Sequence, residues 1–338
     1  MIRPGPRNLI TDTGGLAVGQ AEDLNALTGV TVILPESRAV AAVDVRGGAP
    51  GTRETDALEP HNLVDAVDAI VLSGGSVYGL DAAGGVAAAL GAMGRGYSLA
   101  NSHLVAPVVP AAILFDLTNG GVKDWGAEPP YRALGIAALK AASADFTLGN
   151  AGAGLGARAG AYKGGVGSAS AVDEDGLVVG ALVAANPLGS PLVPGSGVFW
   201  AQPFALGDEL GMRRPFPEGP LEADWPADSK TGPLPPRANT TIGVVATNAA
   251  LTPAEAKRVA MMAQDGYARA CRPMHTAMDG DVVFALATGT HDLAGPRPLA
   301  VSRIGMIAAD CAARALARGV HAARSIGTMR AVRDVFPD

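Results

Sequence analysis

The dipeptide Asn239-Thr240 has the residue types and the setting that self-cleavage chemistry requires. It stands where a polar stretch with seven prolines, residues 213–238, gives way to the apolar residues 241–246. A proline-rich polar stretch is typical of an exposed loop, and a β-branched apolar run is typical of a buried strand. A hydroxyl group at this junction can attack the preceding carbonyl, and the α-amine so released titrates near about pH 8 and can act as a base. An ordinary turn is the alternative for the same dipeptide.

Two carboxylates flank a glycine at Asp279-Gly280-Asp281, at the start of the apolar run 281–287. At one end of a sheet, such a pair could hold a protonated amine and orient a hydroxyl, and mutual repulsion would couple the two titrations. A simple Asp-Gly turn is the alternative. A metal site with His275 as the third ligand is disfavoured, because no other His or Cys clusters nearby in the sequence.

Lys163 and Asn186 are two further candidates. Lys163 ends a glycine-rich run, residues 150–163, that could carry an ammonium group into a cleft, although a solvated surface lysine is the alternative. The run lacks the Gly-Lys-Ser/Thr ending of a phosphate loop, so a nucleotide site is not expected. Asn186 closes an apolar strand, where its amide could donate a hydrogen bond to an oxyanion. One such donor stabilises the transition state by about 3–4 kcal/mol. Asparagine before proline can also act only as a strand terminator.

Residues 73–79 nearly match a nucleophile elbow between a strand and a helix, but Tyr78 stands where the elbow has its second glycine. The amides of Gly74 and Gly75, at the start of the helix, could bind an oxyanion or a carboxylate. The corresponding alternative is a hydrolase that uses Ser76. Such an enzyme would survive Thr240→Ala and would fail with Ser76→Ala.

The elements that must position these residues follow from the apolar pattern. Strands are expected at residues 30–34, 39–45, 69–72, 111–117, 168–172, 177–184, 241–247 and 281–287, and helices at 78–93, 130–142, 253–271 and 300–325. Residues 173–176 predict a hairpin turn, and residues 252–255 predict a capping box with proline at the first helical position. The part after Asn239 has too few strands for its own core, so its strands should enter a sheet built by the first part.

Composition narrows the class of protein. A chain of 338 residues suits one large α/β domain or two ordinary ones. With 48% hydrophobic but only 4% aromatic residues and 45 glycines, the core must consist of small aliphatic side chains on closely packed backbones. Net charge −6 without a basic run argues against a nucleic-acid partner.

The sequence also bears on compartment. The first residues show no secretory signal, and the uncharged stretch 176–207 is interrupted by prolines, so we expect a soluble cytoplasmic protein without a membrane partner. Cys271 and Cys311 each fall in an expected helix at core spacing. They are interpreted as small buried hydrophobic residues in a reducing compartment.

The order of these motifs resembles the DmpA-type L-aminopeptidase/D-esterase family of self-processing N-terminal-nucleophile hydrolases. The resemblance is greatest to its threonine-nucleophile branch, which contains the nylon-oligomer (6-aminohexanoate-oligomer) endohydrolase. It covers nearly the whole chain and is carried by residues 43–49, 74–85, 132–135, 152–154, 186–187, 239–242, 275–276 and 278–281. The segments at 239–242 and 275–281 are the most specific, and their separation fits the family pattern.

The resemblance implies a fold, a four-layer αββα sandwich like that of the ornithine acetyltransferases. It implies one domain cleaved into residues 1–239 and 240–338, with 213–238 an exposed loop before the cleavage site. It also implies a homo-oligomer, a tetramer or larger, that acts on a small amide or oligopeptide without a cofactor.

The resemblance also implies roles for site residues. Thr240 would be the nucleophile and its freed amine the base. Lys163 and Asn186 would match the active-site lysine and the oxyanion-binding asparagine. Asp279 and Asp281 would match the paired aspartates that orient the threonine.

One position departs from the family pattern. Phe115, just before Asp116, stands where the nylon hydrolases of the family have a tyrosine. The loop around Lys163 also differs in length and sequence. Phe115, with few aromatic residues near the site, favours linear aliphatic amides, either ω-amino-acid oligomers or peptides with small N-terminal residues. An aminopeptidase, an acyltransferase and a non-catalytic binding protein of the same fold are the alternatives.

Overall fold

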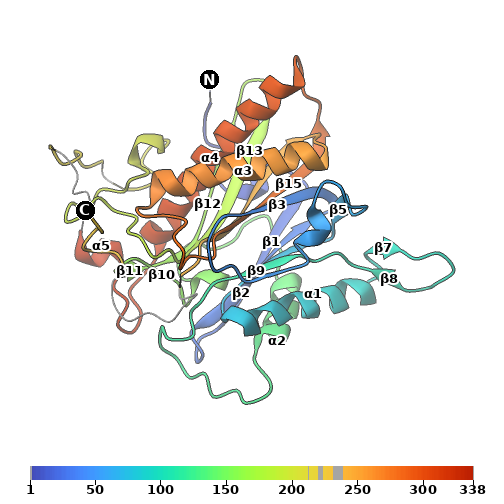
Figure 1. Cartoon of the computed structure of the whole chain (residues 1–338), viewed down its shortest axis with the longest axis horizontal. Helices are drawn as coiled ribbons and strands as arrows, with labels where there is room; N and C mark the ends of the chain where they lie inside the picture. The colour runs from blue at the N-terminus through green and yellow to red at the C-terminus, as the bar shows by residue number, and fades with distance from the viewer. Residues whose placement is uncertain (1, 212, 220–223, 231–238, 338) are drawn as a thin grey trace.

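The computed structural model describes residues 2–211, 213–219, 224–230 and 239–337. Two β-sheets are stacked face to face, and a pair of helices covers the outer face of each (Figure 1). The helices are α1 (Asp81–Ala92), α2 (Tyr131–Lys140), α3 (Pro253–Ala270), α4 (Arg297–Ala322) and the short α5 (Val332–Val335). The four layers confirm the αββα sandwich expected from the sequence.

The six-stranded sheet lies under α3 and α4 and contains the site described below. Its strand order is β12 (Gly165–Val172), β13 (Val178–Ala185), β14 (Ile242–Ala249), β15 (Val282–His291), β3 (Ala39–Val45) and β5 (Ala66–Val67). Strands β14 and β15 pair in parallel, and the other neighbours pair antiparallel. Strands from both sides of Asn239-Thr240 therefore share one sheet, as the sequence predicted.

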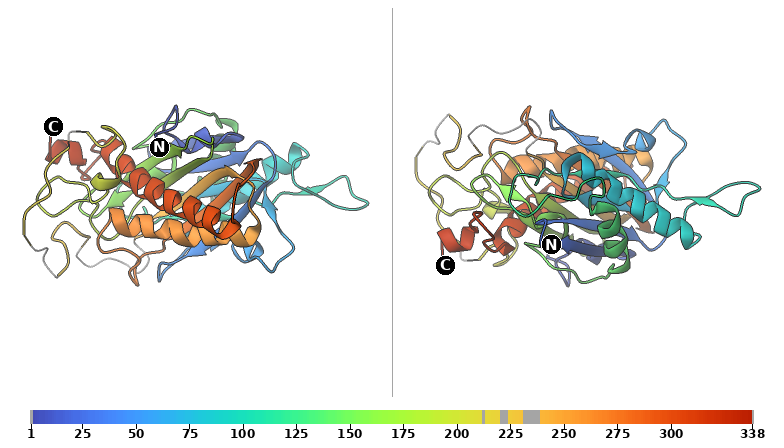
Figure 2. Two further views of the ribbon diagram at one scale, coloured as in Figure 1. Left: turned by 90° about the horizontal axis from the view of Figure 1, so that it is seen from above. Right: turned by 90° about the horizontal axis from the view of Figure 1, so that it is seen from below.

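The five-stranded sheet lies over α1 and α2. Its order is β1 (Leu16–Asp23), β2 (Thr28–Pro35), β6 (Ile70–Ser73), β9 (Ala111–Ile113) and β4 (Thr52–Arg53). Two small ribbons, β7–β8 (Tyr97–Ser98, Val105–Ala106) and β10–β11 (Arg158–Ala159, Tyr162–Lys163), stand apart from both sheets. The views from above and below show α3 and α4 side by side on one face and α1 and α2 on the other (Figure 2).

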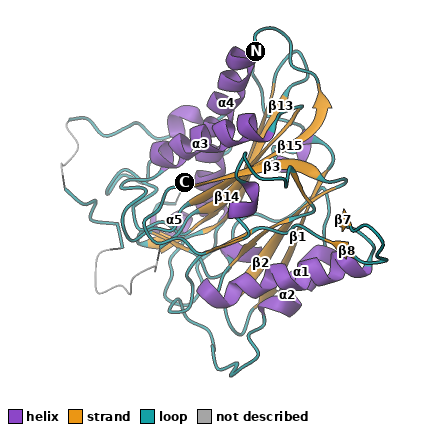
Figure 3. Cartoon of the chain, turned by 45° about the vertical axis from the view of Figure 1, so that its right-hand side comes forward, coloured by secondary structure: helices purple, strands orange, loops and turns teal. Residues whose placement is uncertain are grey.

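Small residues bring these layers close together. The core between the two sheets is built from residues such as Val18, Ile33, Val244 and Phe284, all nearly inaccessible to solvent. Where α3 crosses α4, a Cβ on Gly266 would overlap the Ala309 carbonyl oxygen, so only glycine fits. Figure 3 shows the strands enclosed between the helix pairs. The sparse aromatic content of the chain thus corresponds to tight backbone packing.

Several expected boundaries differ from those observed. The strand expected at 111–117 ends at Ile113. Leu114 N–H makes the last bond to β6, to the Ser73 carbonyl oxygen at 2.9 Å, and Asp116 beyond it accepts from Gly75 N–H. Cys271 follows α3 rather than lying in it, and both cysteines are buried and free. The capping box at Thr252 and Glu255 is confirmed: the two side chains bond reciprocally to the backbone at the start of α3.

The stretch 213–238 is not uniformly exposed as expected. Ser229 and Lys230 are buried at 5% and 7% exposure, because the backbone of Lys230 donates to the Leu188 carbonyl oxygen at 2.9 Å. Phe216 and Trp225, by contrast, are exposed. Residues 220–223 and 231–238 of this stretch lie outside the described residues.

Candidate active site

Thr240 lies just before β14, at the end of the six-stranded sheet where β13 also ends. The side chain is 2% exposed, so the hydroxyl is closed to bulk solvent in the continuous chain. The backbone N–H of Thr240 donates to the Asn186 carbonyl oxygen at 3.0 Å, and the Oγ1 hydroxyl donates to the Asn239 carbonyl oxygen. The hydroxyl is therefore in direct contact with the peptide group that it would have to attack.

The Asn239 carbonyl oxygen accepts a second hydrogen bond. The Gly280 N–H donates to it at 2.9 Å, the range required of a donor that stabilises a developing oxyanion. Both polar atoms of the Asn239 side chain are buried and lack a partner among the described residues.

Asp279 and Asp281 are fully buried on either side of Gly280. Asp279 accepts from the backbone and hydroxyl of Thr276 through Oδ2, at 2.9 and 2.5 Å, and from Leu188 N–H through Oδ1 at 3.0 Å. Asp281 accepts from Thr241 N–H through Oδ1 at 2.7 Å. The two carboxylates thus fix Leu188, two residues after Asn186, and Thr241, next to Thr240, and among the described residues neither forms a hydrogen bond with the Thr240 hydroxyl.

The ring of His275 is hydrogen-bonded to the carboxylate of Asp281. Its Nδ1 lies 2.9 Å from Asp281 Oδ2, and its backbone N–H donates to the same oxygen at 3.2 Å. Burial raises the pKa of Asp281, the charge of Asp279 raises it further, and the hydrogen bond from His275 opposes both effects. Within the described parts of the chain, no group of three or more His, Cys, Asp or Glu side chains could hold a metal ion.

The segment that follows β3 supports the aspartate loop, the turn that carries Asp279, Gly280 and Asp281. Arg46 N–H donates to the Asp281 carbonyl oxygen at 3.0 Å, and Ala49 N–H donates to that of Asp279 at 2.8 Å. A Cβ on Gly47 would overlap the carbonyl group of Asp279. The glycines of residues 43–49 therefore let this backbone run directly against the main chain of residues 277–281.

Asn186 lies at the site, but its side-chain amide points elsewhere than expected. Its Nδ2 donates to the Phe115 carbonyl oxygen at 3.1 Å, and its Oδ1 accepts from Arg158 N–H at 2.9 Å. In the continuous chain the donor on the Asn239 carbonyl is the Gly280 N–H, and Asn186 contributes its main-chain carbonyl to the amine of Thr240. Backbone donors carry no sequence signature, which is why Gly280 was not singled out for this role.

Lys163 is completely buried, so it is not the surface lysine that the sequence left as an alternative. Its ammonium donates to the carbonyl oxygens of Gly154, Ala157 and Gly164 at 2.8, 3.0 and 2.7 Å. Burial lowers its pKa to about 7 against the attraction of Asp116. Because the next amide after Ala157 is the one that binds Asn186, Lys163 lies one peptide group behind the site.

The hydrogen bonds and ring contacts found for Gly74, Gly75 and Tyr78 are with groups other than Thr240. Gly74 N–H donates to the Gly29 carbonyl oxygen at 2.9 Å and Gly75 N–H to Asp116 Oδ1 at 2.8 Å, so both amides are already engaged. Tyr78 is 46% exposed and packs edge-on against Trp125. Phe115 reaches the site through its carbonyl group, as the acceptor from Asn186.

Lys230 is a site residue that the sequence did not reveal. Its Nζ donates to the main-chain oxygen of Asn186 at 3.1 Å and to Oδ1 at 3.2 Å. Burial lowers its pKa to about 7, as does the neighbouring charge of Arg158. A polar, proline-rich stretch predicts exposure, and only its closeness in the chain to Thr240 could have drawn attention to this lysine.

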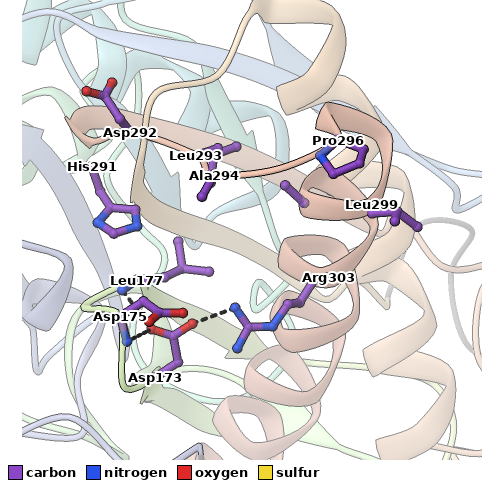
Figure 4. A pocket seen from close by; sticks show the side chains of 11 residues that line it. Asp173, Asp175, Leu177, His291, Asp292, Leu293, Ala294, Pro296, Leu299 and Arg303 are labelled. Carbon is purple, nitrogen blue, oxygen red and sulfur yellow. Dashed lines mark hydrogen bonds and ion pairs between the residues drawn. The ribbon is translucent and has the colours of Figure 1, made fainter.

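A cavity of about 420 Å³ lies at the opposite end of the six-stranded sheet, before β13 begins. There the ion pair of Arg303 with Asp173, 2.5 Å long, faces Leu177, His291 and Leu299 (Figure 4). The length of β13 separates this cavity from Thr240, so it is not part of the site.

No helix in the described ranges is long and apolar enough to cross a membrane.

Comparison with solved structures supports the fold. A β-aminopeptidase from a Burkholderia species matches with a TM-score of 0.66 at 24% identity, covering 97% of this chain and 90% of that one. An L-aminopeptidase D-Ala-esterase/amidase from Ochrobactrum anthropi, described as a variant of the Ntn hydrolase fold, matches with a TM-score of 0.67 at 22% identity. That match covers 97% of this chain and 90% of the other. The chain thus shares the Ntn-hydrolase type of αββα sandwich.

Sequence comparison establishes the family. A protein described as an uncharacterized aminopeptidase of Mycobacterium tuberculosis is 44% identical over 347 residues, covering 98% of both chains. A 6-aminohexanoate-oligomer endohydrolase of Kocuria sp. is 32% identical over 295 residues, covering 86% of this chain and 77% of that protein. The model of peptidase family S58 matches residues 8–333. The chain therefore belongs to peptidase family S58 and is a hydrolase of peptide or amide bonds.

Proposed function

We propose that this protein is a self-processing threonine amidohydrolase. Thr240 first cleaves the chain after Asn239 and then, as a new N-terminal residue, hydrolyses linear aliphatic amides through an acyl-threonine intermediate. The observation that carries the proposal is the pair of donors on the Asn239 carbonyl, the Thr240 hydroxyl and the Gly280 N–H. A hydroxyl in contact with its own preceding peptide group, with a second donor on the same carbonyl oxygen, favours an intramolecular acyl shift.

In the first step the Thr240 Oγ1 attacks the Asn239 carbonyl carbon. The C–O bond forms, the C–N bond of the peptide breaks, and the proton of the hydroxyl passes to the departing nitrogen. The Gly280 N–H stabilises the oxygen of the tetrahedral intermediate. Water then hydrolyses the ester, leaving a carboxylate on Asn239 and a free amine on Thr240.

The same groups serve the second reaction. Departure of Asn239 frees the Gly280 N–H, which faces the nucleophile and can receive the carbonyl oxygen of a substrate amide. The α-amine of Thr240, bound to the Asn186 carbonyl oxygen, then takes the proton of the hydroxyl. An α-amine has a lower pKa than an ordinary lysine side chain, so more of it is neutral and able to accept a proton at neutral pH. Asp279 and Asp281 keep their positioning role through Leu188 and Thr241.

Burial of Thr240 alone would also suit a non-catalytic protein of this fold. A binding function alone does not account for the hydrogen bond from the Thr240 hydroxyl to the Asn239 carbonyl, beside an asparagine side chain that has no hydrogen-bond partner among the described residues. Buried polar atoms without partners are rare and concentrate where a structure stores strain. These features favour a precursor poised for cleavage.

The substrate proposed is a linear amide with a small or unbranched acyl part, such as a 6-aminohexanoate oligomer. The 32% identical relatives are named as endohydrolases of that oligomer, which supports this choice. A second candidate, an aminopeptidase for small N-terminal residues, is supported by the names of the 44% identical relatives. Acyl transfer to an amine in place of water is the third possibility.

A substrate panel separates these activities. Purified wild type and Thr240→Ala are incubated with 6-aminohexanoate oligomers, with alanine and glycine amides, and with each amide plus an amino-acid acceptor. We expect wild type alone to release product, and turnover of the oligomer to exceed that of the aminoacyl amides. Faster aminoacyl amide turnover would assign the aminopeptidase role, and donor turnover that grows with acceptor concentration would assign acyl transfer. Release of product by Thr240→Ala would contradict the proposed nucleophile.

A further inference from the structure

The segment Asp228–Lys230 is tied to the body of the protein by its own hydrogen bonds. The Asp228 carbonyl oxygen accepts from Ala161 N–H at 2.7 Å, and its Oδ2 accepts from Ser190 Oγ at 2.7 Å and Tyr162 Oη at 3.2 Å. Lys230 N–H donates to the Leu188 carbonyl oxygen at 2.9 Å. None of these bonds involves Asn239 or Thr240. Cleavage between those two residues therefore leaves the anchor of Lys230 intact.

The Lys230 ammonium and the Thr240 nitrogen share one acceptor. Lys230 Nζ lies 3.1 Å from the Asn186 carbonyl oxygen, and Thr240 N lies 3.0 Å from the same atom. Two donors on one oxygen are at most about 6 Å apart. Lys230 also holds Asn186 Oδ1, so one side chain fixes both oxygens of the residue that binds the Thr240 nitrogen.

We propose that Lys230 is a further positioning residue of the active site, one that fixes Asn186 and keeps a cationic group beside the amine of Thr240 after cleavage. This inference rests on the proposed function, because only a cleaved chain has a free amine at Thr240. Lys230 acts through Asn186 and through its charge. It makes no bond to the Thr240 hydroxyl or to the Asn239 carbonyl among the contacts of the described residues.

The charge of Lys230 has a definite effect on its neighbour. A cation near an amine disfavours the protonated amine, so Lys230 lowers the pH above which Thr240 is a neutral base. The groups that act on Lys230 are Arg158, which lowers its pKa, and Asp279, Cys271 and Asp281, which raise it. Burial lowers the pKa of Lys230 to about 7. Because both nitrogens bond to the Asn186 carbonyl oxygen, the charge on either group affects the titration of the other.

Three variants test the proposal. Lys230→Met removes the charge and keeps an unbranched stem, Lys230→Arg makes the charge permanent, and Lys140→Met removes a charge from the exposed end of α2 as a control. Intact-mass spectrometry first measures the cleaved fraction of each protein, and thermal melting reports its folding. The pH profile of kcat/KM on an amide substrate is then recorded for the cleaved proteins.

We expect the acidic limb of the Lys230→Met profile to move to higher pH by about one unit, because loss of the cation raises the pKa of the Thr240 amine. Lys230→Arg should keep the limb at or below its wild-type position, and Lys140→Met should match wild type. A folded Lys230→Met that stays uncut beside a cut Lys230→Arg would equally support a role of the charge.

Two results would overturn the proposal. One is a pH profile of Lys230→Met that coincides with that of wild type. The other is a Lys230→Arg protein whose acidic limb moves to higher pH, or whose cleavage is lost, as much as in Lys230→Met. That second result would indicate that the side chain acts by packing alone. If Lys230→Met does not fold, Lys230→Arg decides: a limb above the wild-type position refutes the inference, and one at or below it agrees with it. An uncut, inactive wild type would instead remove the proposed function itself.

Discussion

At the scale of single residues, the peptide group between Asn239 and Thr240 is hydrogen-bonded at both its oxygen and its nitrogen. The carbonyl oxygen receives one hydrogen bond from the residue that would attack it and one from a backbone amide on the aspartate loop. The nitrogen of the same bond donates to Asn186. Each atom that changes its bonding during cleavage is thus already held in the uncleaved chain, which is what preorganised catalysis requires.

Replacement of Gly280 tests the oxyanion site directly. A Cβ at this position would lie 2.8 Å from Thr240 Oγ1 and 2.6 Å from the Ala49 carbonyl oxygen, so Gly280→Ala must displace the hydroxyl or the loop. We expect cleavage to slow by at least about 100-fold, the value of one oxyanion donor. Intact-mass spectrometry over several days measures this rate. Full cleavage of freshly purified Gly280→Ala would contradict the assigned geometry.

Asp281 is the second residue whose replacement is informative. Asp281→Asn keeps the shape of the side chain but sets an N–H₂ group against one of the two donors, Thr241 N–H or His275 N–H, which bond to different oxygens of the carboxylate. One unpaired buried donor costs about 1–3 kcal/mol, so cleavage should slow by about 10- to 100-fold. Asp175→Asn, in the exposed hairpin turn, is the matched control and should cleave as wild type does. Equal rates in both variants would refute a positioning role for Asp281.

At the scale of elements, the order of strands and helices was predictable because it depends on local patterns. The run 39–45 and the capping box at Thr252 have strong local signals, and both are confirmed. Strand β1 was missed because Gln20, Glu22 and Asp23 break its apolar alternation at a partly exposed edge of the sheet. The end of β9 at Ile113 depends on contacts with residues around Ser73 that no local pattern encodes.

The sequence indicated several residues that the structure brings together at this end of the sheet, but it indicated neither Lys230 nor the contacts between them. Thr240, Asn186, Asp279 and Asp281 meet at one end of the sheet, as the motifs imply. The amide that donates to the scissile carbonyl belongs to the backbone of Gly280, and a backbone N–H has no side-chain signature in the sequence. Such partners are set by the tertiary path of the chain, so sequence patterns cannot identify them.

The crossing of α3 and α4 offers a prediction about stability. Gly266→Ala would force a Cβ into the Ala309 carbonyl group, whereas a Cβ at Gly91 in α1 meets only Pro107 at 3.7 Å. We expect Gly266→Ala to lower the stability by about 1–3 kcal/mol, and Gly91→Ala to raise it by about 0.5–1 kcal/mol through helix propensity. Thermal melting of the two proteins measures the difference. A Gly266→Ala protein as stable as Gly91→Ala would show that the helices can separate at little cost.

At the scale of the whole molecule, the proposed cleavage divides the chain but not the fold. Strands β14 and β15 follow the cleavage site, yet they lie between β13 and β3, which precede it. Helices α3 and α4 likewise follow the site and pack on that sheet. Separation of the two parts would expose the interior of the six-stranded sheet and much of its apolar core.

The cleaved parts should therefore remain one particle. Size-exclusion chromatography of the cleaved protein is expected to give a single peak that contains both chains. Electrophoresis under denaturing conditions should resolve a chain of residues 1–239 and one of residues 240–338. Elution of the shorter chain on its own in native buffer would contradict the shared sheet as the basis of association. The same column reports whether the particle is the homo-oligomer expected from the family resemblance.

The most direct test of the central claim is intact-protein mass spectrometry of purified wild type beside Thr240→Ala. The proposed mechanism predicts two wild-type species, one ending at Asn239 and one beginning at Thr240, and a single full-length species for the variant. A full-length wild-type protein that stays uncut on prolonged incubation, or a Thr240→Ala protein cut at the same bond, would contradict the assignment of Thr240 as the nucleophile of this hydrolase.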